Sequence, residues 1–215
     1  ATAGVAARYT TDFRAARVFV TTPSLFGLPL TSNVFLSRSR EQVGSSERPF
    51  VTDKSDLTLE QRFRTRARLQ IAYGYSFQRN HTFDVNADPA DPFAFDIAVN
   101  VAKLTATGIR DTRDDLVDAT RGQFFSGTFE YGVSALGSDL RFAKQFAEQT
   151  YYRTLGGGLV FATAGRLGLA AGYGQDLIPS ERFFAGGGST VRGYAEGTLG
   201  PRNAFGDPVG GNAML

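Results

Sequence analysis

The sequence predicts an all-β protein whose antiparallel strands form part of a transmembrane β-barrel. Three observations lead to this prediction. Apolar and polar residues alternate along most of the chain, as they do along a strand with two different faces. The longest run of apolar residues and glycine is about eight residues, far short of the ~20 that a membrane helix needs. Turn-forming residues separate the alternating stretches, as expected for hairpin connections.

The clearest alternation runs from Leu57 to Phe77. Its odd positions are mostly apolar or aromatic, and its even positions are mostly charged, polar or small. These 21 residues exceed the 9–11 that cross a membrane as one strand, so a tight turn is expected between Arg64 and Ala67. The odd residues should then face outward on both sides of that turn.

The same period-two pattern recurs in the rest of the chain. Phe125, Phe129 and Tyr131 share one face, and Leu167 and Leu169 share another. Placing strands between the turn signals predicts nine of them, near residues 2–10, 14–22, 30–42, 56–64, 68–82, 94–110, 121–135, 139–153 and 158–174.

A soluble β-sandwich also alternates, with its apolar face turned inward. Two features favour the membrane. Most of the predicted strands are longer than the five or six residues usual in globular proteins. The polar face also carries arginine, glutamate and glutamine in mid-strand, as the wall of a wet lumen would.

The composition excludes several kinds of site. The chain of 215 residues has no cysteine and a single histidine, His81, so disulfides, thiolate metal sites and multi-histidine sites are excluded. His81 is expected to be an ordinary surface residue. The net charge of +2 does not indicate a nucleic-acid partner. No metal site is therefore expected. His81 is the single candidate catalytic base, and no serine or carboxylate constellation is visible around it in the sequence, so we expect no enzyme activity and no cofactor. The chain starts without an initiator methionine or signal peptide, which suggests an internal piece of a longer protein.

The segment from Gly186 to Gly211 breaks the pattern. It holds nine glycines in 26 residues, yet aromatic and branched residues lie among them and immediately before them. A flexible linker would lack such anchors. The segment is therefore expected to be an ordered loop whose glycines adopt unusual dihedral angles.

This loop carries recognisable motifs. Arg182-Phe-Phe-Ala-Gly-Gly-Gly-Ser-Thr-Val-Arg-Gly-Tyr194 is followed by Leu199-Gly-Pro-Arg and by Gly206-Asp-Pro-Val-Gly-Gly211. Together they resemble the long sixth extracellular loop of outer-membrane protein assembly factors of the BamA and TamA type, the bacterial surface antigen family. The lead-in Arg182-Phe-Phe-Ala-Gly-Gly187 looks most like TamA. The stretch Arg110-Asp-Thr-Arg-Asp-Asp-Leu-Val-Asp-Ala-Thr-Arg-Gly122 is similar to a mid-barrel turn of the same family.

The resemblance implies a fragment of a sixteen-stranded antiparallel transmembrane barrel. Residues 1–174 would be about the third to eleventh strands. Residues 175–215 would be the long extracellular loop, folded into the lumen, and the start of the next strand. The first and last strands, whose seam is the functional site of the family, and the periplasmic POTRA domains would lie outside the chain.

The resemblance also singles out residues. The core motif is Val191, Arg192, Gly193 and Tyr194, and the family arginine that matches Arg192 pairs with acidic groups on the inner wall. Glu60 or Glu130, or only water, could substitute for those groups here. The supporting loop residues are Phe183, Phe184, Gly186, Gly187, Gly200, Pro201, Gly210 and Gly211. The mid-barrel turn motif comprises Asp111, Arg113, Asp114, Arg121 and Gly122, and its spacing does not fit a calcium loop.

The function that the resemblance implies is folding and insertion of β-barrel or autotransporter clients into the bacterial outer membrane. A client strand would add to the exposed edge of an opened seam, beside thinned lipid. Its partners would be unfolded outer-membrane proteins, membrane lipid and periplasmic assembly partners reached through POTRA domains. The alternative is a two-partner secretion transporter, which has a similar loop but exports a soluble client through its pore.

Overall fold

The computed structural model describes residues 1–44, 49–65, 67–84, 96–178, 181–188, 190–195, 197–203, 206 and 208–215. Of residues 43, 44, 49, 50 and 84 it describes the backbone alone. Ser189 and Asp207 of the quoted loop motifs lie outside the described residues.

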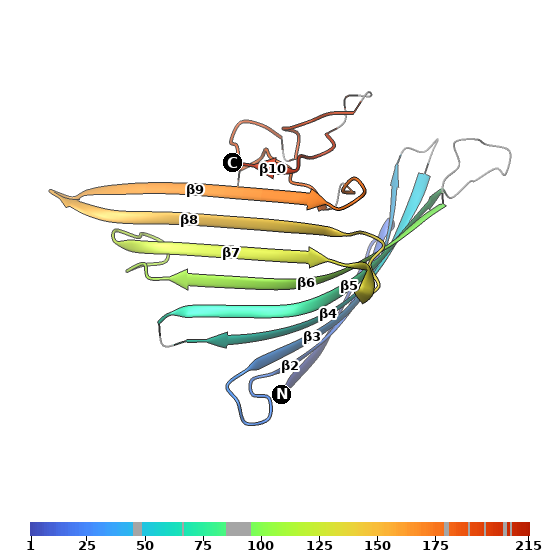
Figure 1. Cartoon of the computed structure of the whole chain (residues 1–215), viewed down its shortest axis with the longest axis horizontal. Coiled ribbons are helices and arrows are strands. Elements are labelled where there is room, and N and C mark those ends of the chain that lie inside the picture. The colour runs from blue at the N-terminus through green and yellow to red at the C-terminus, as the bar shows by residue number, and fades with distance from the viewer. Residues whose placement is uncertain are drawn as a thin grey trace. The chain divides into compact units, whose positions relative to one another are not determined.

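The described residues form ten strands and one short 3-10 turn, η1 (Ser134–Leu136). The strands are β1 (Thr2–Tyr9), β2 (Phe13–Thr22), β3 (Thr31–Gly44), β4 (Pro49–Arg64), β5 (Leu69–Asp84), β6 (Asp96–Asp111), β7 (Gly122–Gly132), β8 (Phe142–Gly156), β9 (Leu159–Gly172) and β10 (Ala213–Met214). They are hydrogen-bonded in sequence order in one sheet, β1 to β10 (Figure 1). No helix in this part of the chain could span a membrane.

All nine predicted strands are present, and their boundaries agree within three residues except at the start of β4, which was wrong. The sequence predicted a break from residue 43 to residue 55, but β3 continues to Gly44 and β4 already begins at Pro49. The polar run Thr52 to Ser55 pairs with Arg38 to Glu41 across the hairpin. Backbone hydrogen bonds form whatever the side chain, so this polar segment extends the strand beyond its apolar part.

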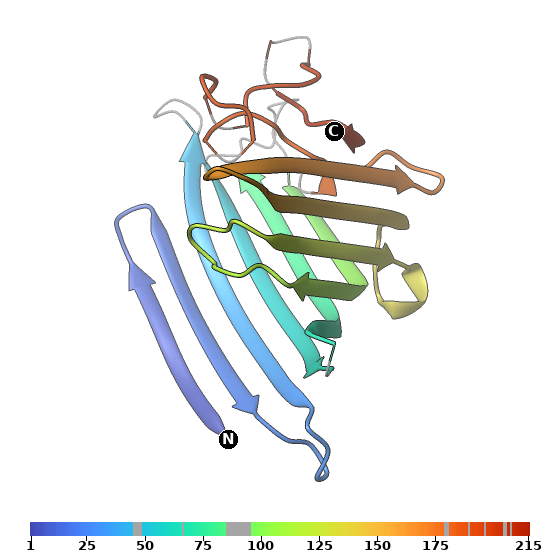
Figure 2. The same ribbon diagram turned by 90° about the vertical axis from the view of Figure 1, so that its left-hand side faces the viewer.

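The chain divides into two compact units. Unit 1 comprises residues 1–63, 72–105 and 132–140, and unit 2 comprises residues 64–71, 106–131 and 141–215. Figure 2 shows β1 and β2 side by side at the end of the strand order that carries the N-terminus.

In unit 1 the register aligns apolar residues into continuous rows across β1 to β4. Val5, Val18, Leu36 and Leu57 are cross-strand partners in one row, and Ala3, Val20, Val34 and Leu59 form the next row. The exposed members of these rows include Leu36, at 55% of its accessible surface. Tyr73 of β5 is also exposed. This is the apolar face of unit 1, and it carries odd residues of the Leu57–Phe77 stretch as the alternation predicted.

Both faces of β6 are covered where the segment after β7 returns to β5 and β6. Val101 and Ala102 of β6 and Leu140 are buried. The Tyr75 hydroxyl donates a hydrogen bond to the Leu136 carbonyl (2.9 Å), and the backbone N–H of Asn100 donates one to the Asp139 carboxylate (2.7 Å). These contacts attach the segment from Ser134 to Leu140 to the sheet.

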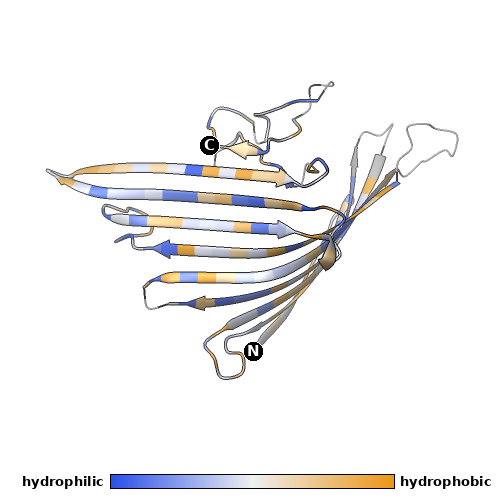
Figure 3. Cartoon of the chain, in the orientation of Figure 1, coloured by the Kyte–Doolittle hydropathy of each residue, from blue (hydrophilic) through white to orange (hydrophobic). Residues whose placement is uncertain are grey.

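In unit 2 the two faces of β8 and β9 differ sharply in chemistry. Leu159, Phe161, Leu167 and Leu169 are exposed on one side, the apolar face of unit 2, and Phe125 and Phe129 of β7 are exposed as well. The opposite side, the polar face of unit 2, carries the cross-strand pairs Lys144–Ala170, Phe146–Gly168 and Glu148–Arg166. The alternating colours along these strands follow the same pattern (Figure 3).

Candidate functional site: a loop docked on the polar face of β8 and β9

The segment after β9 turns back at once onto the polar face of unit 2. Gly172 ends the strand opposite Phe142, which is fully buried. A Cβ atom on Gly172 would lie 2.3 Å from the Gln175 carbonyl oxygen and 3.6 Å from the Leu177 side chain, which is itself buried. Glycine is therefore required for the close approach of the loop to the strand at this point.

Phe183 makes the second contact with this face. Its ring lies over Gly168 of β9, where a Cβ atom would be only 2.8 Å from the ring. The ring centroid is 6.3 Å from that of Phe146, the cross-strand partner of Gly168. The Lys144 ammonium lies 5.0 Å from the centre of the Phe183 ring, within the range of a cation–π interaction.

A charged pair ties the loop to β8 beside these rings. The carboxylate of Glu181 lies 3.8 Å from Lys144 Nζ, and the Glu181 side chain is 4% exposed. Removing a carboxylate from water is costly unless a cation and hydrogen bonds compensate it. The position of Lys144 on the polar face thus fixes where Glu181 can lie.

The loop is closed at its base by backbone pairing. Phe183 and Gly211 exchange two hydrogen bonds of 2.9 and 2.8 Å, and the N–H of Ala170 donates to the Asn212 carbonyl (2.7 Å). Gly210 has a positive φ of 72°, and a Cβ atom there would lie 2.9 Å from the Phe184 ring. Phe183, Phe184, Gly210 and Gly211 therefore form one junction.

Further backbone hydrogen bonds join segments of the loop that lie beyond this junction. The N–H of Leu199 donates to the Ala185 carbonyl (2.9 Å), and that of Val209 donates to the Pro201 carbonyl (2.9 Å). Arg202, which follows Gly200 and Pro201, donates to the carbonyls of Thr198 and Gly206. These bonds satisfy backbone groups that have no sheet partner.

The motif at the tip forms a tight turn. The Thr190 hydroxyl donates to the Gly186 carbonyl (2.7 Å) and accepts from the Gly186 N–H (2.8 Å). The N–H of Gly187 donates to the Tyr194 carbonyl (3.0 Å). Gly186 and Gly193 have φ values of 115° and 90°, where other residues would be strained.

The tip residues Val191 to Tyr194 are exposed. Tyr194 exposes 56% of its surface, and Arg192 makes no ion pair or hydrogen bond within the described part of the chain. Glu60 accepts hydrogen bonds from Asn33 (3.0 Å) and Arg62 (2.9 Å), and Glu130 has an interaction of its own. The structure therefore builds the turn that presents Arg192 but provides no acidic partner for it among these residues.

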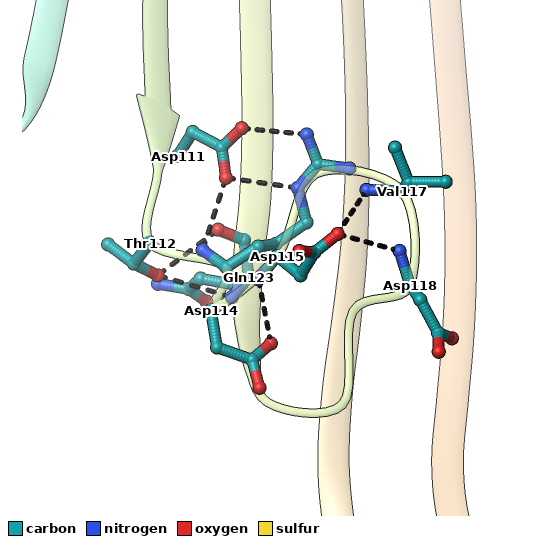
Figure 4. Close-up of polar contacts among 8 residues, drawn as sticks. Asp111, Thr112, Asp114, Asp115, Val117, Asp118 and Gln123 are labelled. Atoms are coloured by element: carbon teal, nitrogen blue, oxygen red, sulfur yellow. Dashed lines mark hydrogen bonds and ion pairs between the residues drawn. The ribbon is translucent and has the colours of Figure 1, made fainter.

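The second motif forms the connection between β6 and β7 (Figure 4). Asp111 receives two hydrogen bonds from the Arg113 guanidinium, of 3.0 and 2.7 Å. The same guanidinium lies 5.1 Å from the centre of the Phe124 ring. Gly122 has a φ of 102°, and a Cβ atom there would lie 2.3 Å from the Thr112 carbonyl oxygen.

Asp114 organises the rest of this turn. Its carboxylate accepts hydrogen bonds from the Thr120 hydroxyl (2.6 Å) and from the N–H groups of Asp115, Thr120 and Arg121 (3.0–3.1 Å). The Thr120 hydroxyl and these N–H groups hold the pKa of Asp114 well below its usual range. Arg121 itself is exposed, and its carbonyl accepts a bond from the Asp114 N–H (3.0 Å). The motif is therefore a structural turn held by one carboxylate.

The single histidine, His81, lies beside a carboxylate. His81 Nε2 lies 2.6 Å from the Asp96 carboxylate at the exposed start of β6, a partner that the sequence did not indicate. No group of three or more possible metal ligands occurs in the described ranges.

The sequence did not indicate which residues hold the loop against β8 and β9. Gly168, Lys144 and Glu181 were not singled out, although a glycine within an otherwise apolar strand indicates close approach of another group. Nothing in the local pattern indicates which aromatic residue fills the space above Gly168.

Comparison with known proteins assigns this arrangement to a family. The Omp85 superfamily domain matches residues 1–215. The outer membrane protein assembly factor BamA of Nitratidesulfovibrio vulgaris is 30% identical over 147 residues, 67% of this chain and 19% of that protein. BamA of Neisseria meningitidis serogroup B is 34% identical over 109 residues, 48% of this chain and 13% of that protein.

Two further relatives extend the comparison. A SAM50-like protein of Schizosaccharomyces pombe is 28% identical over 116 residues, 52% of this chain and 24% of that protein. The crystal structure of BamA from Haemophilus ducreyi lacking POTRA domains 1–3 matches 98% of this chain and 45% of its own, with a TM-score of 0.76 and 18% identity. The chain thus has the fold of part of that protein and spans less than a quarter of the curated relatives.

Proposed function

Because the chain belongs to the Omp85 superfamily, we propose that it is part of the barrel wall, with its long loop, of a factor that folds and inserts outer-membrane proteins. The chain lies in an outer membrane as part of an integral β-barrel. Its clients would be unfolded β-barrel or autotransporter proteins. The names of the two BamA relatives, both outer membrane protein assembly factors, support this proposal.

The observation that carries the proposal is the docked loop. Leu177, Glu181 and Phe183 all contact even-numbered residues on the polar face of β8 and β9. In a membrane barrel the polar face lines the lumen and the apolar face meets lipid. Residues 175–215 would thus comprise the extracellular loop folded into the lumen and the start of the next strand, with residues 1–174 forming the wall.

Within this proposal the tip motif has a specific role. Arg192 is presented by a turn that Thr190 and the positive-φ glycines hold in shape, and it is unpaired among the described residues. An arginine in a lumen needs an acidic partner. We assign that partner to wall strands outside this chain, so that Arg192 links the loop to the far wall.

The partners beyond the barrel follow from the same proposal. The lipid beside the seam and periplasmic assembly partners reached through POTRA domains would act together with this wall. The resemblance of the lead-in Arg182–Gly187 to TamA stays a prediction, because the relatives described above are named BamA or SAM50-like.

Reconstitution tests this function. The full-length protein in liposomes should speed the folding of an added unfolded barrel client, read as the heat-modifiable band on a gel, relative to liposomes that hold a porin. Release of a soluble client into the lumen of the liposomes, without any gain in client insertion, would instead support the two-partner secretion alternative.

A further inference from the structure

Three arginines lie together on the apolar face of unit 1. Arg14 of β2 and Arg40 of β3 are direct cross-strand partners, and Arg38 lies two residues before Arg40 on the same side of β3. This side also carries Val18 and Leu36, which are both exposed. We call Arg14, Arg38 and Arg40 the basic triad.

The triad is incompletely neutralised. Arg40 Nε lies 3.7 Å from the Asp53 carboxylate, and the Arg14 guanidinium stacks over the Tyr9 ring at 5.1 Å. Arg38 makes no ion pair or hydrogen bond within the described ranges. Asp12 lines an adjoining pocket of about 390 Å³ with Arg14 and Arg40. Like charges directly opposite each other destabilise a sheet, so a triad with two nearby carboxylates has capacity for an added anion.

The triad lies where the apolar rows of β2 to β4 end, which in a membrane barrel would be the edge of the membrane. Arg38 follows Leu36 on the same face, about 7 Å further along the strand. The triad lies where β3 approaches its C-terminal end. Arginine side chains at such a border extend to the level of the lipid headgroups.

The surface between the arginines is hollowed. Ala7 and Ala16 are cross-strand partners, and with the triad and Tyr9 they line a shallow pocket of about 320 Å³. The small alanine side chains leave room beside the guanidinium groups. Arginine binds phosphate oxygens in a bidentate manner, which suits a fixed anionic group on an otherwise apolar surface.

From this geometry we propose that the basic triad binds the phosphate group of a lipid headgroup, in the leaflet at the C-terminal end of β3. The acyl chains of that lipid would lie along the rows that contain Val18 and Leu36. This site is independent of the client and of the polar face, and it would hold one anionic lipid against β1 to β3.

Lipid retention tests the proposal. The full-length protein, reconstituted in phosphatidylcholine nanodiscs with and without lipid A, a phosphorylated lipid, would be extracted and analysed by native mass spectrometry. Arg38→Gln removes a side chain that makes no ion pair or hydrogen bond with the described residues and should weaken retention of lipid A roughly fivefold. The triple variant Arg14→Gln/Arg38→Gln/Arg40→Gln should weaken it by about one hundred-fold, with unchanged heat-modifiable mobility showing that the barrel is folded.

A matched control uses an arginine outside the triad. Arg110 is exposed near the end of β6 that leads into the Asp114 turn, and Arg110→Gln should retain lipid A as the wild type does. Equal retention by the triple variant and the wild type would overturn the proposal, as would an equal loss in Arg110→Gln. Full displacement of lipid A by inorganic phosphate would identify a site for a free anion and would also overturn it.

Discussion

At the scale of single residues, the docking of the loop depends on one glycine. Gly168 lies beneath the Phe183 ring, whereas a Cβ atom on Gly165 of the same strand would meet nothing within 4 Å. Gly168→Val should displace the ring and destabilise the barrel by about 1–3 kcal/mol, the usual cost of overpacking. Gly165→Val should have little effect.

Limited proteolysis of the loop, together with urea unfolding in lipid vesicles, measures both effects. Faster cleavage in Gly168→Val alone is the expected result. Equal cleavage rates in the two variants would show that Phe183 does not hold the loop.

The Asp114 turn should depend on pH in a defined direction. Because the folded pKa of Asp114 lies below its value in an unfolded chain, its carboxylate stabilises the turn at all pH values above about 4. That stabilisation is lost as the pH falls further, through the folded pKa. Hydrogen exchange of the Thr120 and Arg121 amides, corrected for the intrinsic rate, should therefore stay slow from neutral pH down to about 4.

Asp114→Asn should speed this exchange even at neutral pH. Asp118→Asn is the control, because the Asp118 carboxylate accepts no hydrogen bond in the described part of the chain. Exchange in Asp114→Asn that matches the wild type at every pH would contradict the assigned role.

At the scale of the elements, the alternation of apolar and polar residues predicted where the strands lie, but it missed the polar first part of β4. The pattern from Leu57 to Phe77 indicated both strands and the turn between them, because one face must be apolar throughout the membrane. Beyond the apolar rows no such constraint acts, and Thr52 to Ser55 therefore resembled a loop although they pair within the β3–β4 hairpin. The loop was identified from its glycines and its resemblance, but its contacts with Lys144 and Gly168 depend on tertiary packing that local patterns do not encode.

The attachment of the loop to β8 can be measured as a coupling energy. Lys144→Met removes the ammonium group beside the buried Glu181 carboxylate and should cost about 3 kcal/mol. Adding Glu181→Gln removes that negative charge, so the double variant should recover a large part of the loss. Urea unfolding in vesicles of the wild type, the two single variants and the double variant completes a double-mutant cycle. Strictly additive losses of unfolding free energy would show that Lys144 and Glu181 are not coupled.

For the molecule as a whole, a membrane barrel requires the apolar face to meet lipid. Leu167 lies on the apolar face of β9, and Ala164 on the polar face of the same strand. Leu167→Arg should destabilise the protein in vesicles by about 2–4 kcal/mol, and Ala164→Arg by much less. The reverse order of costs would favour a sandwich with its apolar face packed inside.

The role of the loop in the assembly of outer-membrane proteins is tested most directly by replacing Arg192 in the full-length protein. Arg192→Ala should leave the barrel folded, with unchanged heat-modifiable mobility, because the sheet is held by hydrogen bonds between its strands and not by the loop tip. It should impair complementation of a strain depleted of its own assembly factor, because the link from loop to wall is lost. Arg153→Ala, an exposed residue of β8 outside the loop, is the control and should complement fully. If the complementation and the gel mobility of Arg192→Ala both match the wild type, Arg192 has no part in client assembly.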